Sequence, residues 1–206
     1  MIVRLLSALL ALIAAPAIAQ TPAPTSTPPA TVRVVLTTEL GAITVEIETG
    51  RAPITAGNFL RYVDSRRMDG VTFYRAMKVG ATGGLIQGGV RDPRRLYPPI
   101  AHEPTSQTGL THSAGALSAP RWAPGTARGD FTILLEPAPA YDANPSAPGD
   151  NLGYAVFGRV VEGMDIVRRI HQAPTSATEG EGVMRGQMLS PQIRIITARR
   201  VAAPGN

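Results

Sequence analysis

The chain has 206 residues, with 20 basic and 15 acidic side chains, and its formal net charge is +5 at pH 7. It contains no cysteine, which excludes disulfides, thiol catalysis and zinc–thiolate sites. Nearly all the basic residues are Arg, and they are spread out without a basic run or interleaved aromatics. We therefore interpret the charge as favouring solubility and expect no nucleic-acid partner.

The N-terminus has the three parts of a secretory signal peptide. Arg4 supplies a positive charge, residues 5–15 are apolar, and Ala17-Ile18-Ala19 forms an A-x-A cleavage site. We predict a signal peptide over residues 1–19, cleaved after Ala19, and export to the periplasm. The apolar run is shorter than the roughly 20 residues of a spanning helix, so a retained anchor is the alternative. We expect no stable membrane insertion after cleavage.

Residues 20–31 are rich in Pro, Thr and Ala and lack apolar periodicity, which predicts an extended linker. Residues 32–203 remain as one domain, long enough to bury a core.

The domain is predicted to open with a hairpin and a helix. Residues 31–39 read as a strand, Gly41 marks a turn, and residues 43–48 alternate so that Ile43, Val45 and Ile47 face inward. A helix then starts at residues 51–53, with Pro in its first turn, and ends before Gly70. Its apolar stripe comprises Ala56, Phe59, Leu60 and Val63.

Residues 71–75 form the next predicted strand. A period of two places Val71, Phe73 and Arg75 on one face. An arginine on an apolar face is out of place unless something needs its charge. The alternative is an edge-strand arginine that points to water.

The remaining pattern consists of short strands. They are predicted over residues 85–90, 115–118, 131–135, 154–160 and 193–198, with loops over 91–114 and 137–151 and a helix near 162–171. About eight short strands and two helices without βαβ repetition favour an antiparallel barrel or sandwich over a doubly wound sheet.

Several segments resemble the cyclophilin family of peptidyl-prolyl cis-trans isomerases. F-Y-R at 73–75 followed by Q-G-G at 87–89 resembles the core of the family, and residues 153–167 resemble its late strand–helix segment. The resemblance covers nearly all of residues 32–203 and is closest to exported bacterial members, which favour Tyr at the position of Tyr154. It implies a mainly β fold, a closed eight-stranded antiparallel barrel capped by two α-helices.

The resemblance also implies a function. We expect an isomerase that accelerates rotation about X-Pro bonds and assists folding of exported proteins, acting on proline-containing unfolded or extended polypeptides as a monomer without cofactors. Arg75 would be catalytic, because a fixed cationic donor stabilises the pyramidal proline nitrogen of the twisted amide. Gln87 would hydrogen-bond the substrate backbone.

The chain departs from the family pattern around the proline pocket. The family pattern is F-H-R-x-I-P-x-F-x-x-Q-G-G, whereas four extra residues separate Arg75 from Gln87 in this chain. Leu85 or Met77 would therefore replace the usual Phe of the pocket. In the family's S-Q-F-F-I segment the second Phe, usually the pocket floor, becomes Thr132.

The other residues that the resemblance assigns to substrate binding are Phe73, Leu85, Gly88, Ala119, Pro120, Arg121, Trp122, Asp130, Phe131, Thr132 and Tyr154. Pro120 removes a backbone donor from its segment. Trp122 is either a groove aromatic or a packing residue, and Asp130 could pair with Arg75, Arg121 or Arg128. The three histidines lack a metal spacing, so we expect no metal.

Two other functions stay open. The loss of pocket aromatics favours a cyclophilin-fold peptide-binding module or holdase with weak or no isomerase activity. An unrelated exported β-barrel that binds a small ligand is a third hypothesis.

Overall fold

The structure is a computed structural model that describes residues 30–201. The predicted signal peptide, its cleavage site after Ala19 and all but the end of the predicted linker lie outside the described residues, as do residues 202 and 203 of the predicted domain. Within residues 30–201, no helix is long and apolar enough to cross a membrane.

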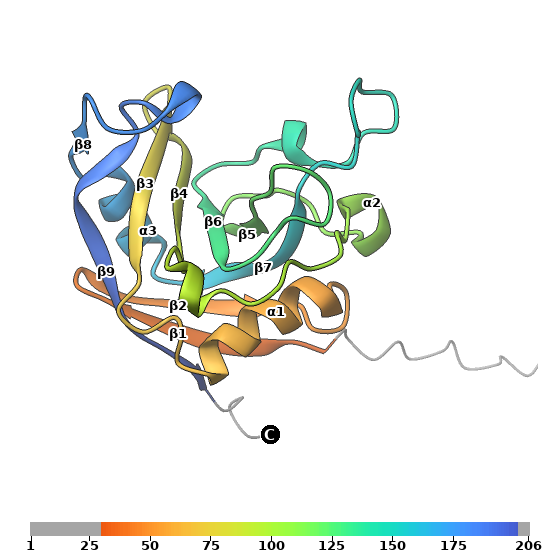
Figure 1. Cartoon of the computed structure of the whole chain (residues 1–206), viewed down its shortest axis with the longest axis horizontal. Helices are drawn as coiled ribbons and strands as arrows, with labels where there is room; N and C mark the ends of the chain where they lie inside the picture. The colour runs from red at the N-terminus through yellow and green to blue at the C-terminus, as the bar shows by residue number, and fades with distance from the viewer. Residues whose placement is uncertain (1–29, 202–206) are drawn as a thin grey trace, which may run out of the picture.

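The strands form one antiparallel sheet that closes on itself (Figure 1). Going round the barrel, the strands are β1 (Val32–Thr38), β2 (Gly41–Ile47), β7 (Ala155–Glu162), β5 (Ala116–Ala119), β6 (Asp130–Leu134), β4 (Gly83–Gly89), β3 (Thr72–Val79) and β9 (Met188–Val201). Pairing of β1 with β9 closes the ring, and the short strand β8 (Thr175–Ser176) pairs with β9. The predicted closed eight-stranded antiparallel barrel is confirmed.

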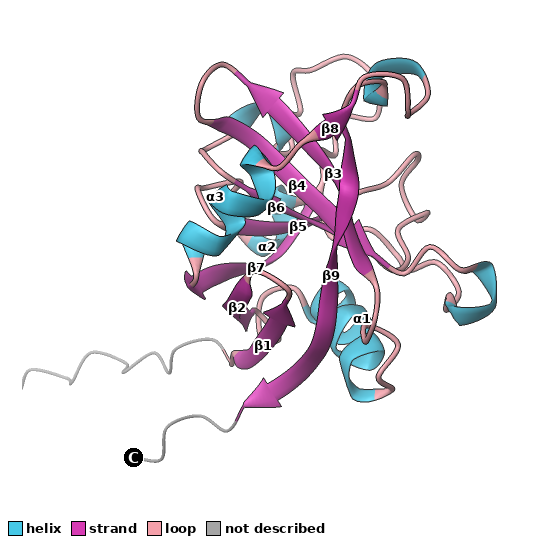
Figure 2. Cartoon of the chain, turned by 90° about the vertical axis from the view of Figure 1, so that its left-hand side faces the viewer, coloured by secondary structure: helices cyan, strands magenta, loops and turns pink. Residues whose placement is uncertain are grey.

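Two helices cover opposite ends of the barrel (Figure 2). Helix α1 (Pro53–Asp64) has Pro at its start and buries the predicted stripe, Ala56, Phe59, Leu60 and Val63. Helix α3 (Met164–Gln172) buries Ile166, Val167 and Ile170 on one face. Residues three and four apart lie on one side of a helix, so each helix has one apolar face. Both apolar faces belong to the same core.

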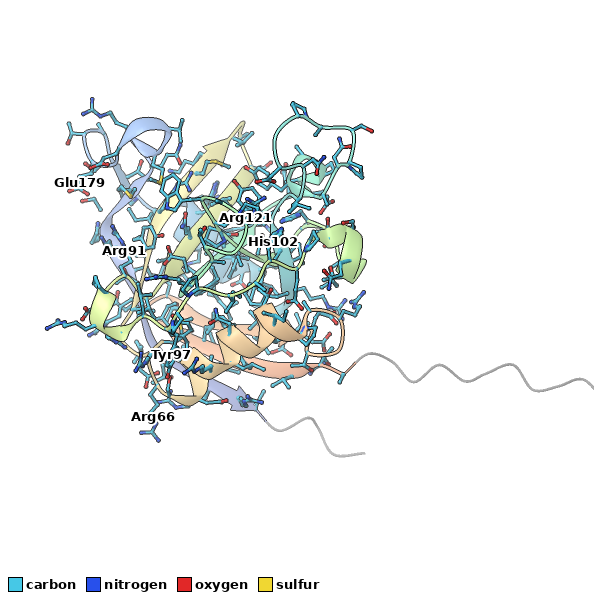
Figure 3. All side chains as sticks on the ribbon, turned by 45° about the vertical axis from the view of Figure 1, so that its right-hand side comes forward. Arg66, Arg91, Tyr97, His102, Arg121 and Glu179 are labelled. Atoms are coloured by element: carbon cyan, nitrogen blue, oxygen red, sulfur yellow. The ribbon has the colours of Figure 1, made fainter. Side chains whose placement is uncertain are left out.

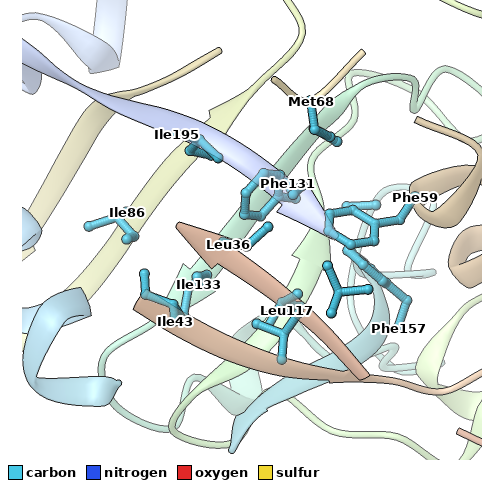
Figure 4. Close-up of a cluster of buried hydrophobic side chains, with 14 of the residues drawn as sticks. Leu36, Ile43, Phe59, Met68, Ile86, Leu117, Phe131, Ile133, Phe157 and Ile195 are labelled. Carbon is cyan, nitrogen blue, oxygen red and sulfur yellow. The ribbon is translucent and has the colours of Figure 1, made fainter. Parts of the chain in front are cut away.

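The barrel interior is a continuous apolar core (Figure 4). Ile43, Val45 and Ile47 are fully buried, which confirms the inward face predicted for β2. Phe131 packs edge-on against Phe59, with ring centroids 5.5 Å apart. This core holds the strands that carry the candidate site in fixed register.

Two strands and the predicted loops differ from the sequence prediction. Strand β3 continues to Val79 and forms a long hairpin with β4, which accommodates the extra residues between Arg75 and Gln87. Strand β9 begins at Met188 rather than at residue 193. The predicted loops contain a short helix, α2 (Thr105–Thr108), and 3-10 turns at Pro93–Arg95 and Pro139–Tyr141, and a further 3-10 turn at Gly182–Met184 lies outside those loops. These pieces are too short to give a periodic apolar pattern.

Candidate active site

A β-bulge in β3 sets the direction of Arg75. Phe73 pairs with Gly88 and Arg75 pairs with Gln87, so Tyr74 has no partner of its own on β4. Phe73 consequently points into the core, while Arg75 lies on the outer face of the barrel with Gln87. The prediction that Arg75 shares a face with Phe73 is therefore wrong, because the bulge interrupts the period of two.

Two rows of side chains run across neighbouring strands on this outer face. Arg75, Gln87, Thr132 and Ser118 are successive cross-strand partners on β3, β4, β6 and β5. Met77, Leu85 and Leu134 form the adjacent row on β3, β4 and β6, and each lies two residues from the member of the first row on its own strand. Because directly paired residues point to the same side, the apolar row lies next to the polar row. The structure thus brings both Met77 and Leu85 to the face of Arg75.

Two amide side chains hold the Arg75 guanidinium. Its Nη1 donates to Gln87 Oε1 at 2.9 Å and its Nε donates to Gln187 Oε1 at 2.8 Å. Gln187 is itself fixed, since its Nε2 donates to the Val183 carbonyl at 2.7 Å. Among the described residues, Nη2 has no hydrogen-bond partner and is available to a ligand.

The charge of Arg75 is not neutralised by a carboxylate. The ion pairs of residues 30–201 do not include Arg75. Burial lowers the pKa of Arg75 from its ordinary value, and the nearby Tyr74, Tyr141 and Tyr154 oppose that shift. An arginine stays protonated under such a shift, so the site presents a partly desolvated cation.

The carboxylate of Asp130 is hydrogen-bonded to Tyr74 and Gln87 and not to one of the arginines that the sequence suggested. Its Oδ2 accepts from the Tyr74 hydroxyl at 2.8 Å and, at 3.5 Å, from Gln87 Nε2. Its Oδ1 is buried without a hydrogen-bond partner. Burial raises the pKa of Asp130, and burial together with this carboxylate raises the pKa of Tyr74. Gln87 therefore bridges Arg75 and Asp130.

Two tyrosines form a wall beside Arg75. Tyr141 and Tyr154 pack edge to face with ring centroids 5.6 Å apart, and the Tyr154 N–H donates to the Tyr141 carbonyl at 2.9 Å. Tyr154 was predicted at the pocket edge, whereas Tyr141 was missed because it lies in a proline-rich segment without a motif. The only feature of the sequence that could have pointed to Tyr141 as a site residue is an aromatic side chain among prolines.

Arg121 supports this wall from the side. Its guanidinium lies 5.6 Å from the Tyr154 ring centroid, and it donates to the Gly153 carbonyl and to Asp150. His102 Nε2 contacts the neighbouring Leu152 carbonyl at 3.2 Å, and Figure 3 shows Arg121 and His102 close together. Arg121 is thus committed to the segment that carries Tyr154.

Some predicted substrate-binding residues lie inside the barrel. Phe73 and Phe131 are 0% exposed and pack against each other at 5.6 Å, so their side chains support the site instead of contacting a substrate. Gly88 is needed for packing, because a Cβ there would lie 2.8 Å from the Thr72 carbonyl oxygen. Ala119 also belongs to the core cluster. The side chains of Phe73, Phe131 and Ala119 therefore face the core, and a substrate contact from these residues stays a prediction for their backbone groups; Gly88 provides the close backbone packing expected of it.

The 120–126 loop leads away from the core. The Trp122 and Ala123 N–H groups both donate to Thr126 Oγ1, which fixes a turn after the half-buried Pro120. Trp122 itself is 89% exposed. It is therefore not a core residue, and no described residue packs it into the groove. Thr132, by contrast, is buried and donates to the Ser118 carbonyl at 3.2 Å.

No metal site accompanies these groups within residues 30–201, where no cluster of three or more His, Asp or Glu side chains is suited to hold an ion.

Comparison with known proteins supports one family. The profile described as "Cyclophilin type peptidyl-prolyl cis-trans isomerase/CLD" matches residues 33–199. The chain is 34% identical over 144 residues to a peptidyl-prolyl cis-trans isomerase of Acinetobacter baylyi, covering 68% of this chain and 71% of that protein. It is 33% identical over 150 residues to peptidyl-prolyl cis-trans isomerase cyp18 of Streptomyces antibioticus, covering 70% and 86%.

A crystal structure of a Cryptosporidium parvum cyclophilin type peptidyl-prolyl cis-trans isomerase has the same fold. It superposes with a TM-score of 0.64 at 18% identity and covers 85% of this chain and 100% of that one.

Proposed function

This chain belongs to the cyclophilin-type peptidyl-prolyl cis-trans isomerases, and we propose that it uses Arg75 to accelerate rotation about X-Pro bonds in exported polypeptides. The Arg75 geometry carries the proposal: a cation on the outer face of β3, held by two neutral amides and unpaired with any carboxylate in the described residues. Proline-containing unfolded or extended chains are the proposed substrates.

The chemistry needs no nucleophile, metal or cofactor, because no covalent bond breaks. Amide resonance gives the X-Pro bond a rotational barrier of roughly 18–20 kcal/mol. Rotation deconjugates the amide and leaves a lone pair on the pyramidal proline nitrogen. A donor that is already positioned and charged stabilises this twisted state more than either planar state, which is the condition for catalysis.

The other residues have supporting roles. Gln87 accepts from Arg75 Nη1 and thereby orients the guanidinium, leaving Nη2 for the substrate. Met77 and Leu85 lie on the same face, where the half-buried Met77 offers apolar surface to the proline ring and the buried Leu85 backs it. Tyr154 and Tyr141 form an aromatic wall near Arg75. These side chains replace the aromatic floor that is absent at Thr132.

Exchange spectroscopy of an Ala-Pro peptide tests the proposal. Wild type should accelerate cis–trans exchange, and Arg75→Ala should reduce the acceleration by ~10²-fold or more, as expected for the loss of a preorganised donor at the transition state. Arg94→Ala is the matched control, since it removes a guanidinium that is 89% exposed and pairs with Asp92. Acceleration that survives Arg75→Ala would exclude the assigned mechanism.

A binding module or holdase is the second candidate. The observation that favours it is Thr132, a buried, hydrogen-bonded residue where the family has an aromatic pocket floor. This alternative predicts that the peptide binds in an NMR titration while its cis–trans exchange stays at the uncatalysed rate.

Export is a separate proposal that depends on residues 1–19. We propose cleavage after Ala19 and a periplasmic location, supported by the charge, apolar run and A-x-A site of the N-terminus. Mass spectrometry of the protein expressed with its own N-terminus should find a mature chain that begins at Gln20. A mature protein that retains Met1 would contradict cleavage and favour the anchor.

A further inference from the structure

A buried chain of hydrogen bonds lies behind the tyrosine wall. His112 Nδ1 lies 2.6 Å from Asp142 Oδ1, and His112 Nε2 lies 2.9 Å from Ser118 Oγ. A carboxylate only accepts, so Nδ1 carries the proton and Nε2 accepts from the Ser118 hydroxyl. Burial lowers the pKa of His112, against the opposing effect of Asp142, which is consistent with a neutral ring.

This arrangement has the residue types of a hydrolytic triad, but its burial argues against nucleophilic catalysis. His112 is 2% exposed and Ser118 is 3% exposed. The Tyr141 ring packs against the edge of His112 with centroids 5.8 Å apart. A substrate carbonyl would have to displace this contact before reaching Ser118, and such a catalytic serine needs direct access to its substrate.

The same contacts suggest a mechanical role. Asp142 directly follows Tyr141, and its Oδ1 also accepts from the His112 backbone N–H at 3.0 Å. The Ala138 N–H donates to the His112 carbonyl at 2.8 Å. His112 is therefore hydrogen-bonded to the residues on both sides of the 3-10 turn at Pro139–Tyr141, and no residue of that turn is itself buried. These bonds, together with the Tyr154 N–H bond to the Tyr141 carbonyl, hold Tyr141 in place.

We propose that His112 is a positioning residue that fixes Tyr141 beside Arg75 by means of Asp142, and so sets the peptide affinity of the groove. The proposal rests on the proposed isomerase function for the groove's role in peptide binding. The Asp142 contact carries the effect, whereas the Ser118 contact only completes the hydrogen bonding of the ring.

Two variants of equal polarity separate these contacts. In His112→Asn the side-chain amide reaches the place of Nδ1 and can still donate to Asp142. In His112→Gln it reaches the place of Nε2, so the side chain contacts only Ser118, while the backbone N–H bond to Asp142 is the same in both variants. We expect His112→Gln and Asp142→Ala to weaken peptide binding in an NMR titration roughly tenfold, the scale of one charge-assisted hydrogen bond. The rate of cis–trans exchange in the bound peptide should stay within about twofold of the wild-type rate. His112→Asn should bind the peptide like wild type.

A second readout does not need a ligand. The Tyr154 amide donates to the Tyr141 carbonyl, so its hydrogen exchange reports on the position of Tyr141. Exchange of this amide should be faster in His112→Gln and Asp142→Ala but unchanged in His112→Asn. A protein that binds or isomerises no peptide would refute the proposed function, while this measurement would still decide the role of His112.

A double-mutant cycle completes the test. If Asp142 acts through Tyr141, Asp142→Ala should not weaken peptide binding further in a Tyr141→Ala background. Fully additive losses would overturn the proposal. Equal losses in His112→Asn and His112→Gln would overturn it as well, because they would indicate that only the volume of the imidazole matters.

Discussion

Replacing Asp130 by Asn should stabilise the protein at neutral pH. The wild-type carboxylate is buried, its Oδ1 has no partner, and its Oδ2 contact with Gln87 is 3.5 Å long. An ionised group in that position is poorly solvated, which is why burial raises the pKa of Asp130. Asn keeps the shape and can still accept from Tyr74, but it carries no charge.

The sign of the pH dependence follows from the direction of this shift. The folded-state pKa of Asp130 lies above the unfolded value, so its contribution to stability is present below the unfolded pKa of 3.8 and is lost as the pH rises through the folded pKa. The advantage of Asp130→Asn should therefore grow with pH. Exchanging an unpaired buried charge for a neutral group is worth ~1 kcal/mol at pH 7.5. For a domain of this size that raises the melting temperature by ~2–4 °C.

Thermal unfolding followed by circular dichroism at pH 4 and pH 7.5 measures this difference. A variant that is no more stable than wild type at pH 7.5 would refute the reasoning, and so would an equal gain at both pH values. Asp150→Asn is the control of opposite sign. Hydrogen bonds from Arg121 lower the pKa of Asp150 to about 2, so its contribution is present above pH 3.8 and is lost as the pH falls through the folded pKa. This variant should be less stable than wild type at pH 7.5.

The remaining predictions concern close packing and exposure. Gly88→Ala should destabilise the protein by ~1–3 kcal/mol in urea unfolding, because its Cβ would lie 2.8 Å from the Thr72 carbonyl oxygen and 2.9 Å from Phe73. Gly57→Ala in α1, where a Cβ meets nothing within 4 Å, should instead gain up to ~1 kcal/mol; equal effects would contradict this packing account. Trp122, the only Trp, should show the fluorescence emission of a hydrated indole and full access to iodide, whereas a blue-shifted, protected emission would place it against the protein.

Local periodicity predicted the parts of the fold in which neighbours along the chain determine the structure. The apolar stripe of α1 and the inward face of Ile43, Val45 and Ile47 are such parts, because side-chain direction there follows a regular period. The order of the barrel strands was implied by the family resemblance, since several motifs occur in the expected order along the chain.

The site was harder to predict because it depends on irregularities and distant contacts. A bulge at Tyr74 cannot be read from alternation, and it reversed the relation between Phe73 and Arg75. The place of Tyr141 depends on the His112–Asp142 contact, which joins residues 30 positions apart. Motif matching also could not show that Phe131 faces the core, since it does not distinguish side chains that touch a ligand from those beneath them.

The length of the β3–β4 hairpin has an evolutionary consequence. Arg75 and Gln87 are direct partners in this chain, and four more residues separate them than in the family pattern. An insertion of even length can be shared equally by the two arms of a hairpin, so every pair below it keeps its partner and its side of the sheet. An odd insertion would need a new bulge or would slip one arm by a residue. The hairpin tip is therefore a place where this lineage could vary in steps of two without disturbing its arginine.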